Sequence, residues 1–325
     1  MILVTGANGL IGSFICKKLA SSNIRFRALV RSKSDLHLLN DLNGVGELYE
    51  SDILDLITLE EAFEGITKVI HCAAIISFIP RNKTKMYKVN IEGTKNIVDL
   101  SLKYNIQKFI YLSSVAAIGK NKIDKIVDEN NTWPGTIAPT NYGKSKYLAE
   151  LEVWRGNMEG LPVITVIPSV VLGPGNWKNG STQLFRYVWE QNKFYKSGFL
   201  NYVDVRDLSE CVIQLINSSL EGERFIVSAG MISYKEFFEK IARQMNRKPP
   251  SIRARPIHLY LALGIDKLLS LFPGKEQRLS RETISQSNNE ITYSSLKIQK
   301  SISQSFTDID DTIQWACQIL KKNYG

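Results

Sequence analysis

The sequence predicts an α/β protein in which a doubly wound parallel sheet is followed by a smaller, mostly helical region. Short apolar runs, typical of buried strands, alternate with helical patterns through the first half of the 325-residue chain. This alternation is typical of parallel sheets, because parallel neighbours need a crossover that is usually a helix. A glycine-rich turn between the first apolar run and the first helical pattern favours the same architecture.

The individual elements follow from the pattern of apolar residues. In the first predicted helix, residues 11–22, Ile11, Ile15 and Leu19 recur at the helical spacing i, i+4, i+8. A further helix is expected at residues 90–105. Buried strands are expected at residues 2–6, 25–31, 68–74, 108–114 and 162–169.

The glycine turn "VTGANGLIG" lies between the first predicted strand and the first predicted helix. Its GxxGxxG spacing differs from the GxGxxG fingerprint, but glycines here serve the same purpose. They let the backbone turn tightly and approach a pyrophosphate at the positive end of the helix. We therefore expect these turn residues to contact a dinucleotide: Gly6, Asn8, Gly9, Leu10, Ile11 and Gly12.

The end of the second predicted strand, "LVRSKSD", indicates which dinucleotide binds. An NAD site usually carries an acid there for the ribose hydroxyls, whereas Arg31 and Lys33 follow this strand. A guanidinium binds a 2′-phosphate in bidentate fashion, so the sequence predicts NADP(H), with NAD(H) as the alternative. Asp35 comes four residues after Arg31, and we expect it to point away along the following helix.

Two further strand ends carry residues suited to a cofactor. Asp52 and Ile53 offer a polar and an apolar group for the edge and face of an adenine, with an ordinary turn as the alternative. Ala73 and Ala74 are small enough for a cofactor to lie across the strand ends, although packing alone could also demand small residues there.

The character of the sequence changes after about residue 172, where glycine and proline cluster and aromatic residues become dense. A later stretch, residues 201–219, has the pattern of a short strand, a turn and a helix, and we expect residues 203–217 to return to the first domain. The predicted dinucleotide-binding domain comprises residues 1–172. Residues 173–202 and 218–325 form the predicted substrate-binding region.

The composition limits the classes of function. Hydrophobic residues make up 44% of the chain, and the formal net charge is +9. The basic residues are scattered, which favours a solvated surface over a nucleic-acid-binding face. The four cysteines form no CxxC pair and no metal-ligand spacing with the three histidines, so we expect no metal site and reduced thiols in a cytoplasmic protein.

The sequence shows neither a signal-peptide pattern nor an apolar run that could span a bilayer. The apolar stretch at residues 256–274 is too short and too interrupted to do so. We expect it to form a helix that packs over the substrate cleft. A helix that lies on a lipid surface is the alternative.

Seven short segments occur in the order in which one enzyme family carries them. They are "TGANGLIG", "HCAA", "NIEGTKN", "YLSSVAAIG", "YGKSK", "VIPSVVLGPGN" and "YVDVRDL". Through these segments the chain resembles the extended short-chain dehydrogenase/reductase family, part of the NAD-dependent epimerase/dehydratase superfamily. The resemblance implies a Rossmann-type sheet and NAD(P)-dependent chemistry.

The resemblance implies that Tyr142 is the catalytic acid/base and that Lys146 and Ser114 assist it. Tyr142 and Lys146 lie about one helical turn apart, so we expect the lysine cation to lower the tyrosine pKa from about 10 and to hold the cofactor ribose. Ser114 would hydrogen-bond the reacting oxygen. It is preferred to Ser113 because the family's serine lies five positions before a glycine, here Gly119.

The family pattern carries over to further positions. The cofactor contacts that it implies outside the glycine turn and the strand ends are Asn90, Tyr142, Lys146 and Pro168. The substrate contacts expected on the same basis are Ser77, Phe78, Ser114 and Trp177.

Several reaction classes share this machinery. Related dehydratases usually carry an Asp-Glu pair after the active serine, whereas Val115 and Ala116 stand here. A nucleotide-sugar epimerase needs cations for a diphosphate, and Arg186, Arg206 and the arginines near position 253 keep that interpretation open. The segment "PSVVLGPGN" and the C-terminal layout bear a closer resemblance to the dihydroflavonol-reductase and 3-beta-hydroxysteroid-dehydrogenase-like branch.

We therefore expect an NADP(H)-dependent oxidoreductase that interconverts a carbonyl and an alcohol on a small apolar or aromatic substrate. The aromatic residues between 177 and 202 would wall its pocket, with core packing as the alternative. A non-catalytic NADP-binding sensor or an RNA-binding scaffold is the interpretation from a different class, and the presence of both Tyr142 and Lys146 argues against it. Helices around 94–104 and 142–156 could pair in a homodimer, and a monomer stays equally open.

Overall fold

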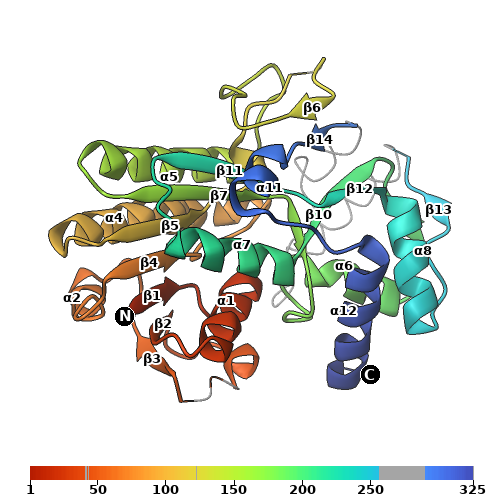
Figure 1. Cartoon of the computed structure of the whole chain (residues 1–325). Coiled ribbons are helices and arrows are strands. Elements are labelled where there is room, and N and C mark those ends of the chain that lie inside the picture. Colours follow the sequence, from red (N-terminus) through yellow and green to blue (C-terminus); the bar gives the residue numbers. More distant parts are fainter. Residues whose placement is uncertain (41, 43, 122, 256–289, 325) are drawn as a thin grey trace.

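The computed structural model describes residues 1–325 except positions 41, 43, 122, 256–289 and 325. Seven parallel strands form its main sheet: β1 (Ile2–Thr5), β2 (Phe26–Val30), β3 (Gly46–Glu50), β4 (Lys68–His71), β5 (Lys108–Leu112), β7 (Val163–Pro168) and β11 (Glu223–Val227). Their spatial order is β11-β7-β5-β4-β1-β2-β3 (Figure 1). The order reverses between β1 and β4, which leaves a crevice at their carboxyl ends and confirms the predicted doubly wound sheet.

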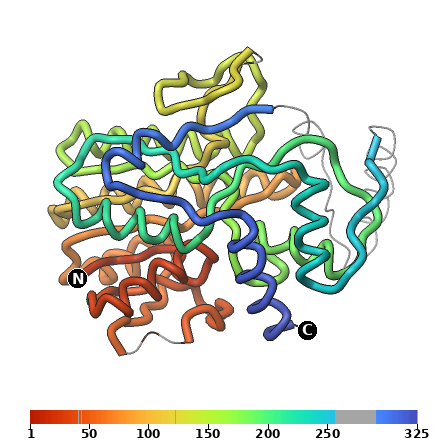
Figure 2. Tube along the Cα trace, turned by 45° about the vertical axis from the view of Figure 1, so that its right-hand side comes forward, coloured from red at the N-terminus to blue at the C-terminus, as the bar shows by residue number. Residues whose placement is uncertain are grey.

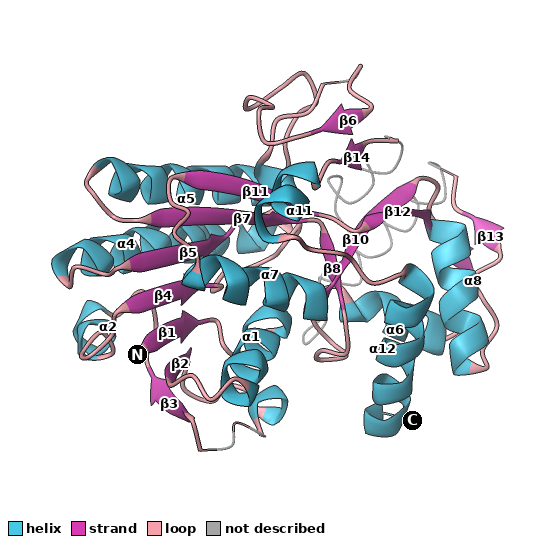
Figure 3. Ribbon diagram, in the orientation of Figure 1, coloured by secondary structure: helices cyan, strands magenta, loops and turns pink. Residues whose placement is uncertain are grey.

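Helices cover both faces of this sheet (Figure 3). Helices α1 (Leu10–Ser21) and α7 (Val205–Asn217) pack together on one face, and α4 (Gly93–Lys103) and α5 (Asn141–Met158) pack together on the other. Successive strand residues point to opposite faces, so neighbours such as Leu3 and Val4 belong to two different hydrophobic cores. The central strands are therefore mostly apolar on both faces.

A smaller region lies beside the carboxyl ends of the main sheet (Figure 2). Its three-stranded sheet has the order β12-β10-β8 and consists of β8 (Val170–Leu172), β10 (Phe199–Asp204) and β12 (Gly230–Ser233). An aromatic core joins the helices that pack there: α6 (Thr182–Trp189), α8 (Tyr234–Met245) and α12 (Ile309–Tyr324). Shorter elements complete the description: α2 (Leu56–Glu61), α3 (Lys83–Tyr87), α11 (Leu296–Ile302), β6 (Ile126–Val127), β9 (Phe194–Tyr195), β13 (Ile252–Arg253) and β14 (Thr292–Tyr293).

The structure corrects three expectations about these elements. Residues 218–325 were all assigned to the substrate-binding region, but β11 is the edge strand of the main sheet. No turn separates the strand and the helix expected at 201–219, because Asp204 ends β10 and also caps α7. The helix expected at 90–105 is preceded by a π-helical turn, η3 (Lys88–Glu92), and its α-helical part begins at Gly93.

No helix in the described part of the chain is both long and apolar enough to cross a membrane. The predicted helix at 256–274 lies outside the described residues.

Two buried carboxylates fasten the C-terminal segment to the start of α7. Asp204 is fully buried and accepts hydrogen bonds from the Arg206 guanidinium at 2.6 Å and from Thr312 Oγ1 at 2.8 Å. Asp207 accepts from both the backbone nitrogen and the hydroxyl of Thr307, at 2.7 and 2.8 Å. Strand β10 of the smaller sheet ends at Asp204, so these contacts connect β10, α7 and α12 in one place.

Replacing Asp204 should therefore destabilise the protein more than the loss of a helix cap alone. We expect Asp204→Ala to lower the free energy of unfolding by about 3 kcal/mol, because it removes a cap and charged hydrogen bonds from a buried site. Asp55→Ala, at the exposed cap of α2, should cost only about 1 kcal/mol. Urea unfolding of both variants measures the difference. Equal losses of unfolding free energy would contradict the proposed role of Asp204 in joining β10, α7 and α12.

Candidate active site

The glycine turn after β1 forms a cradle that side chains would fill. Gly6 has φ of +64°, and a Cβ there would come within 2.7 Å of the Ala73 backbone nitrogen. A Cβ on Gly12 would lie 2.3 Å from the Gly6 carbonyl oxygen. Glycine is therefore required at both positions, which brings the turn into backbone contact with the end of β4.

Helix α1 opens toward this turn with unused donors. Gly9 caps the helix without a side-chain hydrogen bond, and the first turn carries no acidic residue. The first N–H groups of a helix have no partner within it, and the helix dipole adds positive potential there. Asn8, Leu10 and Ile11 line the same turn and are partly exposed. This arrangement fits the pyrophosphate of a dinucleotide.

The loop after β2 carries the two cations expected to bind a 2′-phosphate. Arg31 is exposed, and its guanidinium forms no ion pair with any residue that the structure describes. Lys33 is also exposed and has φ of +58°. After β3, Asp52 Oδ1 accepts from the Leu54 nitrogen at 2.9 Å, while Ile53 is buried. Asp52 is thus the more accessible of the two residues expected near adenine.

Asp35 does not point away along a helix, as its position in the sequence suggested. Only a short 3₁₀ turn, η1 (His37–Leu39), follows it. Its Oδ1 accepts from the backbone and ring nitrogens of His37, and its Oδ2 accepts from Asn176 Nδ2 at 2.9 Å. The His37 backbone hydrogen bond is the largest cause that lowers the Asp35 pKa. The Asp35 carbonyl also accepts from Asn8 Nδ2 at 3.4 Å, so the loop lies against the glycine turn.

Two residues that the sequence analysis did not single out set the position of Tyr142. Thr140 caps α5 and accepts from the Gly143 nitrogen at 3.0 Å. A Cβ on Gly143 would lie 2.4 Å from the Ala116 carbonyl oxygen, so glycine allows α5 to approach the 3₁₀ turn η4 (Val115–Ala117) closely. The close approach brings Tyr142 to Ser114, the residue that caps this turn.

The adjacent serines at the end of β5 point in different directions. Ser114 is partly exposed, accepts from the Ala116 nitrogen at 3.2 Å, and its side chain acts against the rise that burial causes in the pKa of the neighbouring Tyr142. Ser113 is buried and donates to Glu150 Oε2 at 2.6 Å. Only Ser114 therefore shares the space in front of Tyr142.

Burial controls the protonation of Tyr142, which is 8% exposed. Desolvation raises its pKa to about 12, against the opposing hydrogen bond with Ser114. The net lowering expected from Lys146 is not found in the cofactor-free protein, because burial dominates the pKa of Tyr142. At neutral pH Tyr142 holds its proton.

Lys146 lies one turn further along α5 and is 2% exposed. Its Nζ donates to the Leu112 carbonyl at 2.7 Å and lies 4.3 Å from the centre of the Tyr111 ring. Burial lowers the pKa of Lys146 to about 7, while Glu150 and Cys72 act in the opposite direction. An ammonium has three donors, so two remain for another oxygen-rich group.

Asn90 fastens the loop after β4 to helix α5, which carries Tyr142 and Lys146. It lies in the π-helical turn η3, and π-turns are frequent at functional sites. Its Oδ1 accepts from the Ile75 nitrogen at 2.7 Å, and its Nδ2 donates to the Ile75 carbonyl and to Ser145 Oγ at 3.0 and 2.9 Å. Both N–H donors of the Asn90 amide and one acceptor site of its oxygen are thus used by protein groups. Ala74 follows β4 and is exposed, and the buried Pro168 ends β7.

Of the residues expected to contact substrate, some lie near Tyr142 and one lies in a different part of the protein. The Phe78 ring meets the Tyr142 ring edge to face, with centroids 5.9 Å apart. Ser77 Oγ accepts from the Ile79 nitrogen and from the side chain of Asn82, so it holds the loop that carries Phe78. Trp177, by contrast, belongs to the core of the smaller region. It packs against two other aromatic residues, Trp189 and Tyr324.

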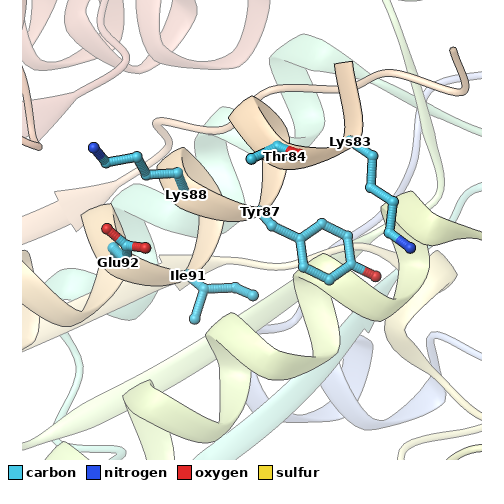
Figure 4. A pocket seen from close by; sticks show the side chains of 6 residues that line it. All are labelled: Lys83, Thr84, Tyr87, Lys88, Ile91 and Glu92. Atoms are coloured by element: carbon cyan, nitrogen blue, oxygen red, sulfur yellow. The ribbon is translucent and has the colours of Figure 1, made fainter. Parts of the chain in front are cut away.

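A surface hollow of about 590 Å³ lies along one helical stretch (Figure 4). Among the described residues, its lining side chains come from α3 and the adjoining η3, so within the described part of the chain no polar groups from distant elements converge there. We therefore do not assign it to the active site. The lining residues are Lys83, Thr84, Tyr87, Lys88, Ile91 and Glu92.

A family model described as the NAD dependent epimerase/dehydratase family matches residues 2–228. The chain belongs to this family. The predicted resemblance to extended short-chain dehydrogenases/reductases is thereby confirmed, and the chain is an NAD(P)-dependent enzyme of that type.

Named relatives of this extended short-chain enzyme include reductases. A putative dihydroflavonol 4-reductase of Synechocystis sp. is 32% identical over 211 residues, which cover 63% of this chain and 60% of that protein. Cinnamoyl-CoA reductase 1 of Oryza sativa subsp. japonica is 27% identical over 270 residues, or 78% of each chain. The solved structure of gox2253 aligns with a TM-score of 0.83 and 29% identity over 100% of this chain and 98% of that one.

The buried Lys146 should make the stability of the cofactor-free enzyme depend on pH. Its pKa falls from 10.5 to about 7 on folding, so between these values the unfolded state binds more protons. The burial penalty is fully present below about pH 7 and is lost as the pH rises to 10.5. Wild-type stability should therefore rise relative to that of Lys146→Met across this window. Urea unfolding at several pH values measures this, and parallel curves would show that Lys146 is not desolvated.

Proposed function

We propose that this enzyme interconverts a carbonyl and an alcohol on a small apolar or aromatic substrate, with NADP(H) as the preferred cofactor and Tyr142 as acid/base. The observation that carries the proposal is the grouping at the end of β5. The Ser114 side chain lies close enough to Tyr142 to act against the rise that burial causes in its pKa, and the Phe78 ring stands 5.9 Å away. A proton donor, a second polar group and an apolar surface are thus adjacent.

The proposed roles follow from the protonation states. Tyr142 keeps its proton at neutral pH and is suited to donate it to a carbonyl oxygen that becomes a hydroxyl, while Ser114 Oγ hydrogen-bonds the same oxygen. In the reverse direction Tyr142 accepts the proton. The bound nicotinamide supplies or accepts the hydride. Lys146 offers its two remaining N–H donors to ribose hydroxyls and adds positive charge beside the tyrosine.

The surroundings favour an apolar substrate over a nucleotide sugar. Val115 and Ala116 follow Ser114, where a dehydratase would carry acids. Two of the cations considered for an epimerase's diphosphate are engaged in ion pairs: Arg186 pairs with Glu190 at 2.7 Å, and Arg206 pairs with the buried Asp204. Arg253 donates to Ser197 Oγ at 2.7 Å. Releasing either of the two paired cations would break an ion pair, so a diphosphate site is not preformed by them.

Turnover of NADPH with a panel of apolar and aromatic aldehydes and ketones tests the proposal. Tyr142→Phe should lower kcat on an accepted substrate by about 10² or more and leave cofactor affinity nearly unchanged, because a positioned acid is lost. Tyr147→Phe, on the same helix and stacked on Trp133, serves as the matched control and should retain wild-type turnover.

Wild-type turnover in Tyr142→Phe would remove Tyr142 from the mechanism. Failure of the whole panel, together with epimerisation of a nucleotide sugar, would support the epimerase alternative instead. Failure of both assays with intact NADPH binding would favour a sensor.

The proposed preference for NADP(H) rests on Arg31 and on the state of Asp35. The Arg31 guanidinium is exposed and unpaired among the described residues, so it is available to a 2′-phosphate. Asp35 is the nearest acid in the loop, but its carboxylate oxygens already accept hydrogen bonds from His37 and Asn176. It therefore has less capacity left for the two ribose hydroxyls that an NAD site must bind.

Removing Arg31 should shift the cofactor preference. One charged hydrogen bond to a phosphate contributes roughly 1.5–3 kcal/mol, so wild-type enzyme should prefer NADPH over NADH by roughly ten- to hundredfold. Arg31→Ala should lose most of this ratio, whereas Arg25→Ala, at the exposed opposite end of β2, should keep it. Titration with both cofactors at one ionic strength measures the ratio. Equal wild-type affinities, or an unchanged ratio in Arg31→Ala, would exclude a 2′-phosphate contact by Arg31.

A further inference from the structure

A continuous series of buried hydrogen bonds runs from β1 to the π-turn through His71. The Ala73 nitrogen donates to Thr5 Oγ1 at 3.2 Å, and Thr5 Oγ1 lies 2.7 Å from His71 Nδ1. On the other side of the ring, His71 Nε2 lies 3.0 Å from Thr94 Oγ1, which donates to the Asn90 carbonyl at 2.6 Å. The side chain of His71 is fully buried.

The two ends of this series fix the direction of every bond in it. A carbonyl oxygen has no hydrogen, so the Thr94 hydroxyl proton must lie on the Asn90 side. Thr94 Oγ1 can then only accept from His71, which requires a hydrogen on Nε2. At the other end the Ala73 N–H can only donate, which leaves the Thr5 hydroxyl proton for Nδ1. One neutral tautomer of His71, with hydrogen on Nε2, satisfies all the partners.

The surroundings of the ring favour this neutral form. The Tyr111 ring stacks on His71 with centroids 5.7 Å apart, and the Phe109 ring lies 6.3 Å away. Burial lowers the pKa of His71 to about 3, and the nearby Lys146 acts in the same direction. A protonated ring would also leave the Thr5 hydroxyl proton without its acceptor. His71 is therefore a fixed linker and not a pH-sensitive group.

We propose that His71 is a positioning residue. It sets the geometry of Asn90 and, through Asn90, the position of helix α5, which carries Tyr142. His71 holds Thr94, Thr94 holds the Asn90 carbonyl, and the Asn90 amide then joins the Ile75 backbone to Ser145. Ser145 Oγ in turn donates to the carbonyl of Tyr142 at 2.8 Å. The series thus links the end of β4, which faces the glycine turn, to the turn of α5 that carries the tyrosine.

The effect on turnover rests on the reductase function proposed above. The hydrogen-bond series itself is testable without substrate. Nitrogen-15 NMR of histidine-labelled protein distinguishes the tautomers, and His37→Asn and His258→Asn variants identify the signals of the other two histidines. We expect His71 to show a protonated Nε2 and an acceptor Nδ1, unchanged between about pH 5 and 9. Hydrogen on Nδ1, or titration in this range, would overturn the proposal.

Substitutions of Thr94 test whether the series positions Asn90. Thr94→Val removes the hydroxyl at nearly constant volume, and Thr94→Ser restores it. Ser101→Ala is the matched control, because Ser101 is buried in the same helix and its hydroxyl also donates to the carbonyl four residues earlier, at 2.7 Å, away from His71.

The amide of Ile75, which donates to Asn90, is the substrate-free probe. We expect Thr94→Val to speed its hydrogen exchange by about tenfold and to lower kcat by a similar factor, as loss of one buried hydrogen bond predicts. Thr94→Ser and Ser101→Ala should stay within about twofold of wild type, since the linkage is intact in both. Unchanged Ile75 exchange in Thr94→Val would overturn the positioning role. Faster Ile75 exchange in Thr94→Val, with no carbonyl turnover in any form of the enzyme, would support the hydrogen-bond series. It would count only against the reductase function.

Discussion

Polar groups buried at the carboxyl end of the sheet must find hydrogen-bond partners inside the protein, and this requirement organises the site. Lys146, Tyr142, His71 and Asn90 are 2%, 8%, 0% and 1% exposed. Leaving one such group unpaired costs about 1–3 kcal/mol. Their partners come from the ends of β1, β4 and β5 and from α4 and α5, so these elements must reach their positions together. The same contacts that satisfy the buried groups therefore fix the geometry of the candidate site.

The fold was predictable from the sequence where burial is a local property. Central strands such as β5 and β7 are covered on both faces, which produces the mostly apolar runs that identify them. The edge strand β3 carries charged residues and is largely exposed, so no apolar run marks it. In β11 the apolar run is only three residues long, Phe225 to Val227, and follows two charged residues. The place of β11 in the main sheet depends on pairing with β7, about 60 residues earlier, and no local pattern encodes that.

The residues of the candidate site likewise fall into two groups: those that short sequence patterns reveal and those whose positions depend on contacts between distant parts of the chain. The glycine turn and the spacing of Tyr142 and Lys146 are short patterns that are visible in the sequence itself. The contact of Asp35 with Asn176 joins positions 141 residues apart, so the direction of the Asp35 side chain was not predictable. The role of His71 was equally hidden, because a histidine in an apolar strand carries no signal of the two threonines that bind it. Thr140 offered a recognisable signal, since a threonine before a helical pattern is a typical cap.

Burial also moves the two central pKa values apart, which sequence spacing alone could not indicate. The ordinary values of tyrosine and lysine, 10.0 and 10.5, become about 12 for Tyr142 and about 7 for Lys146. Both shifts disfavour charge, because desolvation penalises the phenolate and the ammonium alike. At neutral pH the free enzyme thus holds a protonated tyrosine beside a lysine whose positive charge burial disfavours. A proton donor is what carbonyl reduction needs, whereas alcohol oxidation needs the phenolate. Oxidation through Tyr142 therefore depends on positive charge that arrives with the ligand or on full protonation of Lys146.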